Sequence, residues 1–441
     1  MIRALDIWRG GRHDATLSIA ASGEVAMKYT SPDAPRISAS LPNDGMRPSP
    51  ETVRHFFEGL LPDRAEVRSG WADVLSEGLG APVDPADPFA LLRYLGSDVA
   101  GALQILPSGE TPGRVDPLVR VDDREIASRL RSRSVSSAST AGARASDRSN
   151  VGWFALAGGQ SKLALTSFDG GSSWYESTDC APSTHILKPS AAGHPGQALI
   201  EHLSLEGAAR LGLDVARSEY RIFYGTPALI SERHDRAVAD DEIMRLHQED
   251  LCQALGAAPA RKYESDGGPR AHEFARLILD DAGHHDAMQF VRSLAYSAVI
   301  GSADGHAKNY ALRHGEDGSV TLAPLYDVCS FHPWASSRRP TGTELPGLHL
   351  AFAVGSTSRI ESITAGDWEL LARRSGLEEG EVVAAAAEVI AAAPDAIADA
   401  VRSARGSLPV TVEDERRMAR LVGGTAHHAR MMRAGIRGGA Q

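Results

Sequence analysis

The apolar pattern of the chain changes near Arg236, and this change limits the fold more than any other feature of the sequence. Before Arg236, short segments such as "SKLALTSF" and "TPALISER" have a period of two, which is typical of β-strands. One segment in this region, "GQALIEHLSLEGAARLGL", has the apolar spacing of a helix. After Arg236 the pattern is mostly helical. We therefore expect an α+β protein with a β-rich lobe that contains one helix and a mostly helical second lobe.

The first part of the chain predicts an additional β/α module. Residues 1 to about 40 alternate between apolar and polar, and Ser22 and Gly23 mark a turn between two such runs, so we expect a small antiparallel sheet. A helix is predicted next, because Ser49 is suited to cap it and Pro50 suits its first turn. We interpret residues 1–126 as this N-terminal module.

Residues 127–150 are poor in large apolar side chains and rich in Ser, Ala and Arg, which is typical of a flexible linker or loop. The alternative is a regulatory insertion with phosphorylatable serines. In this interpretation the β-rich lobe covers residues 151–236 and the helical lobe covers residues 237–441.

The composition excludes several classes of protein. The 441 residues carry a net charge of −11, which argues against nucleic-acid binding through a generally basic surface. Cys180, Cys252 and Cys329 are far apart and odd in number, so we expect neither a disulfide framework nor a zinc site. The N-terminus has no apolar signal segment, and no run of eighteen uncharged apolar residues occurs. We expect a cytoplasmic protein without a membrane span.

The stretch "GSADGHAKNYAL" carries dense polar chemistry within the helical region. Asp304 and Asn309 are five residues apart, which is the spacing in the catalytic loop of protein kinases. There the aspartate acts as the base and the asparagine binds magnesium. The usual His-Arg before the aspartate is missing, and His306 follows it instead, as in variants that aminoglycoside and phosphoinositide kinases use. From this stretch alone, an ordinary polar loop or a metal site remains an alternative.

The segment "VTLAPLYDVCS" predicts a strand that ends at Asp327, eighteen residues after Asn309. The second magnesium ligand of a kinase is expected at this place, and Tyr326, Asp327 and Val328 stand where D-F-G does in kinases. A lone aspartate after a strand is usually a turn cap. Its order and spacing after Asp304 favour the metal ligand.

Two further segments fit phosphoryl transfer. "THILKPS" predicts a strand that ends in Lys188, and Glu201 follows thirteen residues later on a predicted helix. In kinases a strand lysine binds the nucleotide phosphates and a glutamate orients it. The segment "ALAGGQSKLAL" lies between two strands, and its glycines allow backbone N–H groups to approach an anion. Gln160, Ser161 and Lys162 add polar contacts there.

Six segments resemble, in this order, the HipA family of bacterial serine/threonine kinases, the toxin halves of HipB/HipA toxin–antitoxin modules. They are "LAGGQSK", "THILKP", "ISERHDR", "RLHQEDLCQALG", "GSADGHAKNYAL" and "APLYDV". "FFEGLLPD" and "LLRYLGSDVAGALQILP" resemble the N-terminal domain of the same family. The resemblance covers nearly the whole chain and implies a bilobal protein-kinase-like fold with an extra N-terminal module.

The resemblance implies roles for the matching residues, with ATP and Mg²⁺ as cofactors. It makes Asp304 the catalytic base, Asn309 and Asp327 the magnesium ligands, and Lys188 the phosphate-binding lysine. His306 and Lys308 would support the catalytic loop and the nucleotide. The remaining nucleotide-site residues are Ala157, Gly158, Gly159, Gln160, Ser161 and Lys162 in a covering loop, Glu201 and Tyr326, and Glu232, Arg233 and His234 in a hinge against which adenine lies.

The function that the resemblance implies is that of a growth-arresting toxin. Its substrate would be a translation component such as an aminoacyl-tRNA synthetase. Its partner would be a HipB-like helix-turn-helix antitoxin, through which the complex would reach operator DNA. The family often has a serine, whose autophosphorylation silences the kinase, at the position of Ala155, so we do not expect this control here.

Two other functions stay open. A small-molecule kinase would use the same D-x-H-x-x-N loop, but the N-terminal module and "RLHQEDLCQALG" disfavour it. A non-catalytic repressor or binding component is the second alternative. Because Lys188, Asp304, Asn309 and Asp327 are all present, the sequence gives no reason to expect that the chemistry is lost.

Overall fold

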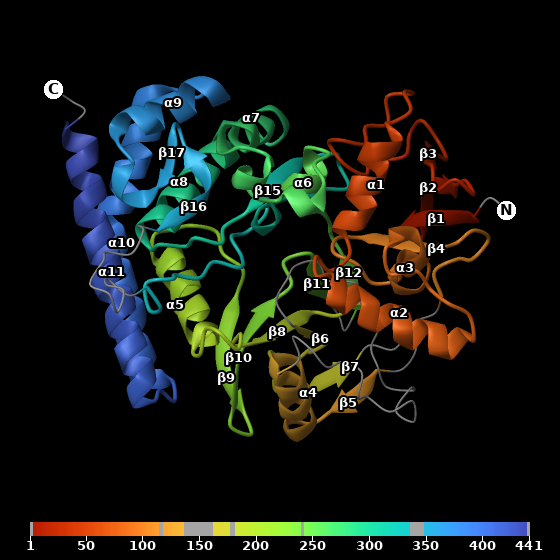
Figure 1. Cartoon of the computed structure of the whole chain (residues 1–441), viewed down its shortest axis with the longest axis horizontal. Helices are drawn as coiled ribbons and strands as arrows, with labels where there is room; N and C mark the ends of the chain where they lie inside the picture. The colour runs from red at the N-terminus through yellow and green to blue at the C-terminus, as the bar shows by residue number, and fades with distance from the viewer. Residues whose placement is uncertain are drawn as a thin grey trace.

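The computed structural model describes residues 3–113, 118–135, 162–176, 181–239, 242–335 and 348–438. Three regions are visible in Figure 1: an N-terminal module in red to orange, a β-rich N-lobe in yellow to green, and a helical C-lobe that continues to blue. Helices and antiparallel sheets occur together, so the α+β class predicted from the sequence is confirmed.

The N-terminal module is a four-stranded antiparallel sheet covered by helices. The strand order is β3-β2-β1-β4. The strands are β1 (Arg3–Arg9), β2 (Arg12–Ile19), β3 (Val25–Tyr29) and β4 (Leu103–Pro107), and the helices are α1 (Pro50–Gly59), α2 (Ala65–Leu79) and α3 (Pro88–Leu95). The predicted cap is present, since the Ser49 side chain accepts a hydrogen bond from the Thr52 amide. Phe56, Phe57 and Phe89 are buried in the core of this module.

The N-lobe has a second antiparallel sheet with the order β6-β8-β10-β9. Its strands are β6 (Leu163–Leu165), β8 (His185–Pro189), β9 (Ser218–Phe223) and β10 (Thr226–Glu232), and a small sheet of β5 (Val119–Val121) and β7 (Trp174–Glu176) lies beside it. The predicted internal helix is α5 (Gln197–Arg210), which packs against β9, β10 and the C-lobe.

The first part of the predicted linker is helical instead. Helix α4 (Asp123–Val135) covers residues 127–135, and Ala127 and Leu130 are fully buried against the N-lobe sheet. Leu130 is the one large apolar residue of residues 127–135 in this buried face, and Ile126 just before the segment completes it, so the apolar content of the segment stays low. The rest of the predicted linker, residues 136–150, lies outside the described residues.

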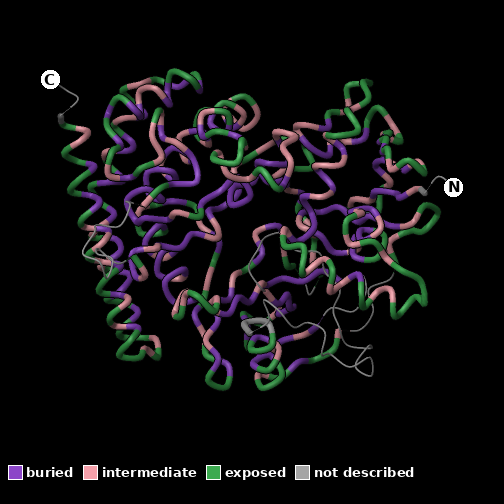
Figure 2. Tube along the Cα trace, in the orientation of Figure 1, coloured by how far each residue is buried: buried purple, intermediate pink, exposed green. Residues whose placement is uncertain are grey.

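The C-lobe is helical but also contains short strands, of which only the one in "VTLAPLYDVCS" was predicted from the sequence. They are β11 (Arg236–Ala239), β12 (Glu242–Arg245), β13 (His247–Asp250), β14 (Ala311–His314), β15 (Val320–Leu322), β16 (His349–Val354) and β17 (Thr357–Arg359). The helices are α6 (Leu251–Ala254), α7 (Ala271–Asp281), α8 (His284–Val299), α9 (Ala365–Ser375), α10 (Glu379–Ser407) and α11 (Val412–Gly438). Strands β14 and β15 pair as an antiparallel hairpin, and β15 ends at Leu322, so the predicted strand does not continue to Asp327. Figure 2 shows in purple the buried residues along the chain, in the orientation of Figure 1.

None of the helices in the described ranges has both the length and the apolar character needed to cross a lipid bilayer.

Helix α11 packs closely on His332 at Gly424, where a Cβ atom would lie 2.2 Å from Cγ of the His332 ring. Replacing glycine by alanine inside a helix usually raises the free energy of unfolding by roughly 0.5–1 kcal/mol. For Gly424→Ala we expect the opposite sign, a loss of about 1–3 kcal/mol, because the methyl group overlaps a buried ring. Denaturant unfolding followed by circular dichroism measures this change.

The neighbouring Gly423 provides a matched control, since a Cβ atom there meets nothing within 4 Å. Gly423→Ala should leave the free energy of unfolding unchanged or raise it. If the two alanine variants have the same free energy of unfolding, the close contact between Gly424 and His332 is wrong.

Candidate active site

The segment after helix α8 forms a compact loop that presents the predicted catalytic residues. Gly301 follows the helix with a φ of +66°, a conformation that favours glycine and turns the chain sharply. The amide of His306 donates to the carbonyl of Asp304 at 2.8 Å, and the amide of Asn309 donates to the carbonyl of His306 at 2.9 Å. These local bonds set the direction of each side chain between α8 and β14.

Asp304 is exposed at the tip of this loop, where a substrate can reach it. The hydroxyl of Tyr263 donates to Oδ1 of Asp304 at 2.5 Å. Burial and the Asp304 carboxylate raise the pKa of Tyr263, so the phenol stays protonated and remains a donor. Sequence reasoning missed Tyr263, since it lies 41 positions before Asp304 in no motif of its own.

His306 and Lys308 belong to this loop, and their side-chain contacts hold it in position. Burial lowers the pKa of His306 to about 4, so its ring is neutral near pH 7. The ring also packs edge to face on Tyr263, with centroids 5.1 Å apart. Nζ of Lys308 donates to the carbonyl of Gly59 at 2.9 Å and lies 3.6 Å from Oδ2 of Asp250. These contacts fit the expected role in supporting the loop, and they connect Lys308 to the N-terminal module.

The two predicted magnesium ligands lie side by side. Nδ2 of Asn309 donates to the carbonyl of Asp327 at 3.3 Å. Oδ1 of Asn309 is buried and has no hydrogen-bond partner among the described residues. Asp327 has a φ of +58°, which is strained for a residue with a side chain and is often found at functional sites. An orphaned amide oxygen on a residue that contacts the backbone of Asp327 fits Mg²⁺, which binds few protein oxygens and completes its shell with phosphate and water.

Lys188 joins the two lobes at this point. Its Nζ lies 2.8 Å from Oε1 of Glu201 on α5 and 2.7 Å from Oδ1 of Asp327. Burial lowers the pKa of Lys188, but the two carboxylates outweigh burial and raise it, so the amine stays charged. Burial opposes the charge of Asp327, yet Lys188 and Lys162 lower its pKa. The sequence spacing had predicted this pair of Lys188 and Glu201.

Lys162 is the last residue of the predicted covering loop and the one that lies within the described residues. Burial, and then repulsion from Lys188, lower the pKa of Lys162 to about 8, so its amine is mostly charged at neutral pH and loses that charge as the pH rises through this value. Asp327 also interacts with it electrostatically, which places Lys162 at the same centre. The other loop residues predicted to bind the nucleotide, Ala157, Gly158, Gly159, Gln160 and Ser161, lie outside the described residues, as does Ala155.

The predicted hinge begins at Glu232, the last residue of strand β10. The amide of Glu232 donates to the carbonyl of Arg217, and the amide of Arg233 donates to the carbonyl of Thr184, at 2.9 and 2.8 Å. The ring of His234 stacks at a tilt on Tyr326, with centroids 5.1 Å apart. The Tyr326 hydroxyl donates to the carbonyl of Lys308 at 2.9 Å. Tyr326 therefore connects the hinge to the catalytic loop.

The side chain of Arg233 points toward the N-terminal module. It is 1% exposed, donates to Oγ of Ser183 at 2.9 Å and to the carbonyl of Val99 at 3.0 Å, and pairs with Asp235 at 2.8 Å. Any role of Arg233 in adenine binding therefore belongs to its backbone. The motif "ISERHDR" therefore contains the predicted hinge and also connects it to the N-terminal module.

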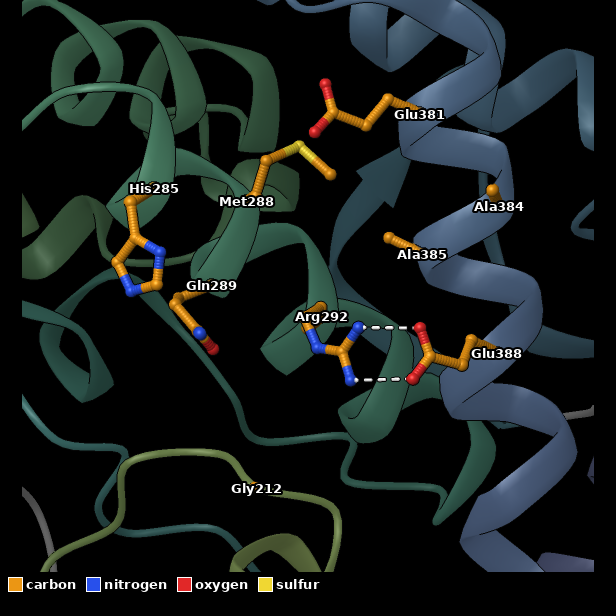
Figure 3. A pocket seen from close by; sticks show the side chains of 9 residues that line it. All are labelled: Gly212, His285, Met288, Gln289, Arg292, Glu381, Ala384, Ala385 and Glu388. Carbon is orange, nitrogen blue, oxygen red and sulfur yellow. Dashed lines mark hydrogen bonds and ion pairs between the residues drawn. The ribbon is translucent and has the colours of Figure 1, made fainter.

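Lys188 does not line either of two hollows among the described residues. The first is a groove between α8 and α10, where Arg292 donates to Glu388 at 2.9 and 3.2 Å (Figure 3). It is lined by Gly212, His285, Met288, Gln289, Arg292, Glu381, Ala384, Ala385 and Glu388. The second shares His285 and Gln289 with the first and reaches Asn309. Of the predicted site residues, only Asn309 lines either hollow.

Comparison with known families identifies two matching regions. The HipA N-terminal domain matches residues 5–106. The HipA-like C-terminal domain matches residues 154–397, which is more than half of the chain.

Individual relatives match over most of their length. Y4mE of Sinorhizobium fredii, named as a candidate kinase, is 33% identical over 85% of this chain and 86% of its own. The serine/threonine-protein kinase toxin HipA of Shewanella oneidensis is 26% identical over 86% of this chain and 83% of its own. In a solved complex of HipA, HipB and operator DNA from Shewanella oneidensis, one chain has the same kinase-like fold, with a TM-score of 0.79 over 97% of both chains at 23% identity. The resemblance inferred from the sequence is therefore confirmed, and this chain belongs to the HipA family.

Proposed function

We propose that the chain is a Mg²⁺- and ATP-dependent protein serine/threonine kinase. The observation that carries this proposal is the position of Lys188, whose amine lies between Glu201 at 2.8 Å and Asp327 at 2.7 Å. A kinase needs this arrangement in order to hold a lysine on the nucleotide phosphates while the two lobes stay aligned. The kinase names of the relatives support the same activity.

Each residue of this site has a proposed role in phosphoryl transfer. Lys188 binds the phosphates, and Glu201 holds the amine in place. Asn309 and Asp327 would hold Mg²⁺, which neutralises the charge that develops on the transferred phosphoryl group. Asp304 accepts the proton of the attacking hydroxyl, because it is the exposed carboxylate of the loop. His306 is neutral and buried, so it supports the loop rather than acting as the base.

The hinge is proposed to bind adenine through its backbone. The amides of Glu232 and Arg233 already donate to Arg217 and Thr184. We therefore assign adenine binding to the backbone carbonyls and the amide around His234. The ring of His234 stacks on Tyr326, and this contact holds the aromatic side chains beside the proposed adenine site in place.

We further propose that the chain acts as a growth-arresting toxin with a HipB-like antitoxin. The Shewanella oneidensis HipA is named as a kinase toxin, and its solved complex contains HipB and operator DNA. The net charge of −11 fits DNA contact made mainly by the partner. A translation component such as an aminoacyl-tRNA synthetase is the proposed substrate, because blocking it would arrest growth.

Labelling in a cell lysate tests the activity and the substrate together. The purified chain is incubated with magnesium and labelled ATP, with the Asp304→Asn variant in parallel, and labelled proteins are identified. We expect a discrete protein band that the variant does not produce. Label in small molecules alone would favour a small-molecule kinase, and no transfer would favour a non-catalytic binding component.

A further inference from the structure

Asp63 of the N-terminal module lies between two lysines of the kinase region. It follows helix α1, in the segment that leads to α2. Its Oδ2 accepts a hydrogen bond from Nζ of Lys262 at 2.8 Å, and its Oδ1 lies 3.2 Å from Nζ of Lys308. One carboxylate from the module therefore contacts two kinase segments that are 46 positions apart in the sequence.

Both lysines adjoin the residues that hold Asp304. Lys308 belongs to the catalytic loop, and its amine also donates to the carbonyl of Gly59 at the end of α1. Lys262 precedes Tyr263, whose hydroxyl donates to Asp304. The carbonyl of Lys262 also accepts a hydrogen bond from the amide of Ala307, at 3.2 Å. The two segments that set the position of Asp304 are thus joined to each other and to Asp63.

The charges make this contact strong. The side chains of Lys308, Asp63 and Lys262 are 3%, 14% and 16% exposed. Burial opposes the charge of the Asp63 carboxylate, but Lys308 and Lys262 outweigh burial and lower its pKa to about 2. Without Asp63, the buried ammonium of Lys308 would keep, among the described residues, only Asp250 as a charged partner, at 3.6 Å. An under-compensated buried charge is costly, so the loop would shift to reach other partners or water.

We propose that Asp63 is a positioning residue for phosphoryl transfer, so that the N-terminal module completes the catalytic loop of the kinase. Asp63 holds Lys262 and Lys308, and these hold Tyr263 and the loop that carries Asp304. Among the described residues, Asp63 has no hydrogen bond or ion pair to Lys188, Glu201 or the hinge, and it reaches the hinge only indirectly, through Lys308 and Tyr326. We therefore expect nucleotide binding to depend on Asp63 much less than the position of Asp304 does. The inference rests on the proposed function in one respect, the assignment of Asp304 as the base.

The substitution Asp63→Asn tests this inference, because asparagine keeps the shape and one acceptor but removes the charge. We expect kcat for the phosphorylated protein to fall about 10- to 100-fold, since small misplacements of a catalytic group have effects of this size. The KM for ATP should stay within about twofold of the wild-type value, because uniform nucleotide binding is unaffected. Asp73→Asn, at an exposed position on α2, is the matched control and should change neither value.

Hydrogen exchange gives a second reading that does not require activity. In the Asp63→Asn variant, amides of residues 262–268 and 302–310 should exchange faster, while those of α5 and β8 should not change. Unchanged exchange in these segments together with unchanged kcat would overturn the inference. If the wild-type chain transfers no phosphate, the proposed function fails, and the exchange data still decide whether Asp63 holds the loop.

A second variant covers the case in which Asp63→Asn does not fold. Lys262→Met removes the other half of the 2.8 Å contact and leaves Asp63 paired with Lys308, so no buried charge loses its partner. We expect the same fall in kcat and the same faster exchange at residues 302–310. A Lys262→Met protein with the kcat and the amide hydrogen exchange of the wild type would contradict the proposed positioning role of Asp63.

Discussion

The Asp304→Asn variant is expected to lose phosphoryl transfer by a factor of about 10² to 10⁴, the usual contribution of a positioned general base. The substitution removes the proton acceptor but adds no bulk. The side chain is exposed, and asparagine still offers an oxygen to the Tyr263 hydroxyl, so the loop should keep its position. Nucleotide affinity and the melting temperature should therefore match those of the wild-type chain.

Initial rates with the identified protein substrate, together with nucleotide binding measured by calorimetry, check this result. Asp395→Asn is the matched control, since Asp395 is an exposed aspartate of the same lobe on helix α10. It should be fully active. Wild-type rates in Asp304→Asn would mean that another group accepts the proton, and a loss of nucleotide affinity would mean that the loop had moved.

The Asp98→Asn variant is expected to lose about 3–5 kcal/mol of the free energy of unfolding, the usual cost of removing one partner of a buried ion pair. Asp98 is 2% exposed and comes from the N-terminal module. Its carboxylate lies 2.7 Å from Arg236, 3.5 Å from Arg233 and 3.6 Å from Arg245. Burial opposes its charge, but these arginines lower the pKa of Asp98.

Removal of this charge leaves Asp235 as the carboxylate that still faces both Arg233 and Arg236, at 2.8 and 3.0 Å. The buried cluster then carries excess positive charge where the module meets the hinge. Urea unfolding, with Asp84→Asn at an exposed position of the same module as control, measures the loss. A change below about 1 kcal/mol would show that water or a rearrangement replaces the missing carboxylate.

Several parts of the fold and site could be predicted from the sequence because they depend on neighbours in the chain. The cap at Ser49 and the strands of the first sheet follow from local residue preferences and a period of two. Lys188 and Glu201 lie on consecutive elements, so their spacing was informative. The order of Asp304, Asn309 and Asp327 also predicted a shared centre, and the contact of Asn309 with Asp327 agrees with it.

Other roles could not be predicted, because burial of a charge is a property of the folded chain. Arg233 was assigned to the hinge from its motif, yet its side chain reaches residues more than 130 positions away. Lys308 meets the carbonyl of Gly59 across 249 positions. In the sequence these are ordinary charged residues, each as easily solvated as paired.

The sequence by itself determined strands β1 to β3, most strands of the N-lobe sheet, the order of the predicted site residues and the family. The tertiary structure alone decided which charges are paired across the boundary between the module and the kinase lobes, including Asp63 and Asp98. The physical reason is that local preferences act over a few residues, whereas desolvation penalises a charge wherever the fold buries it. Only the folded arrangement brings the compensating charge within 4 Å.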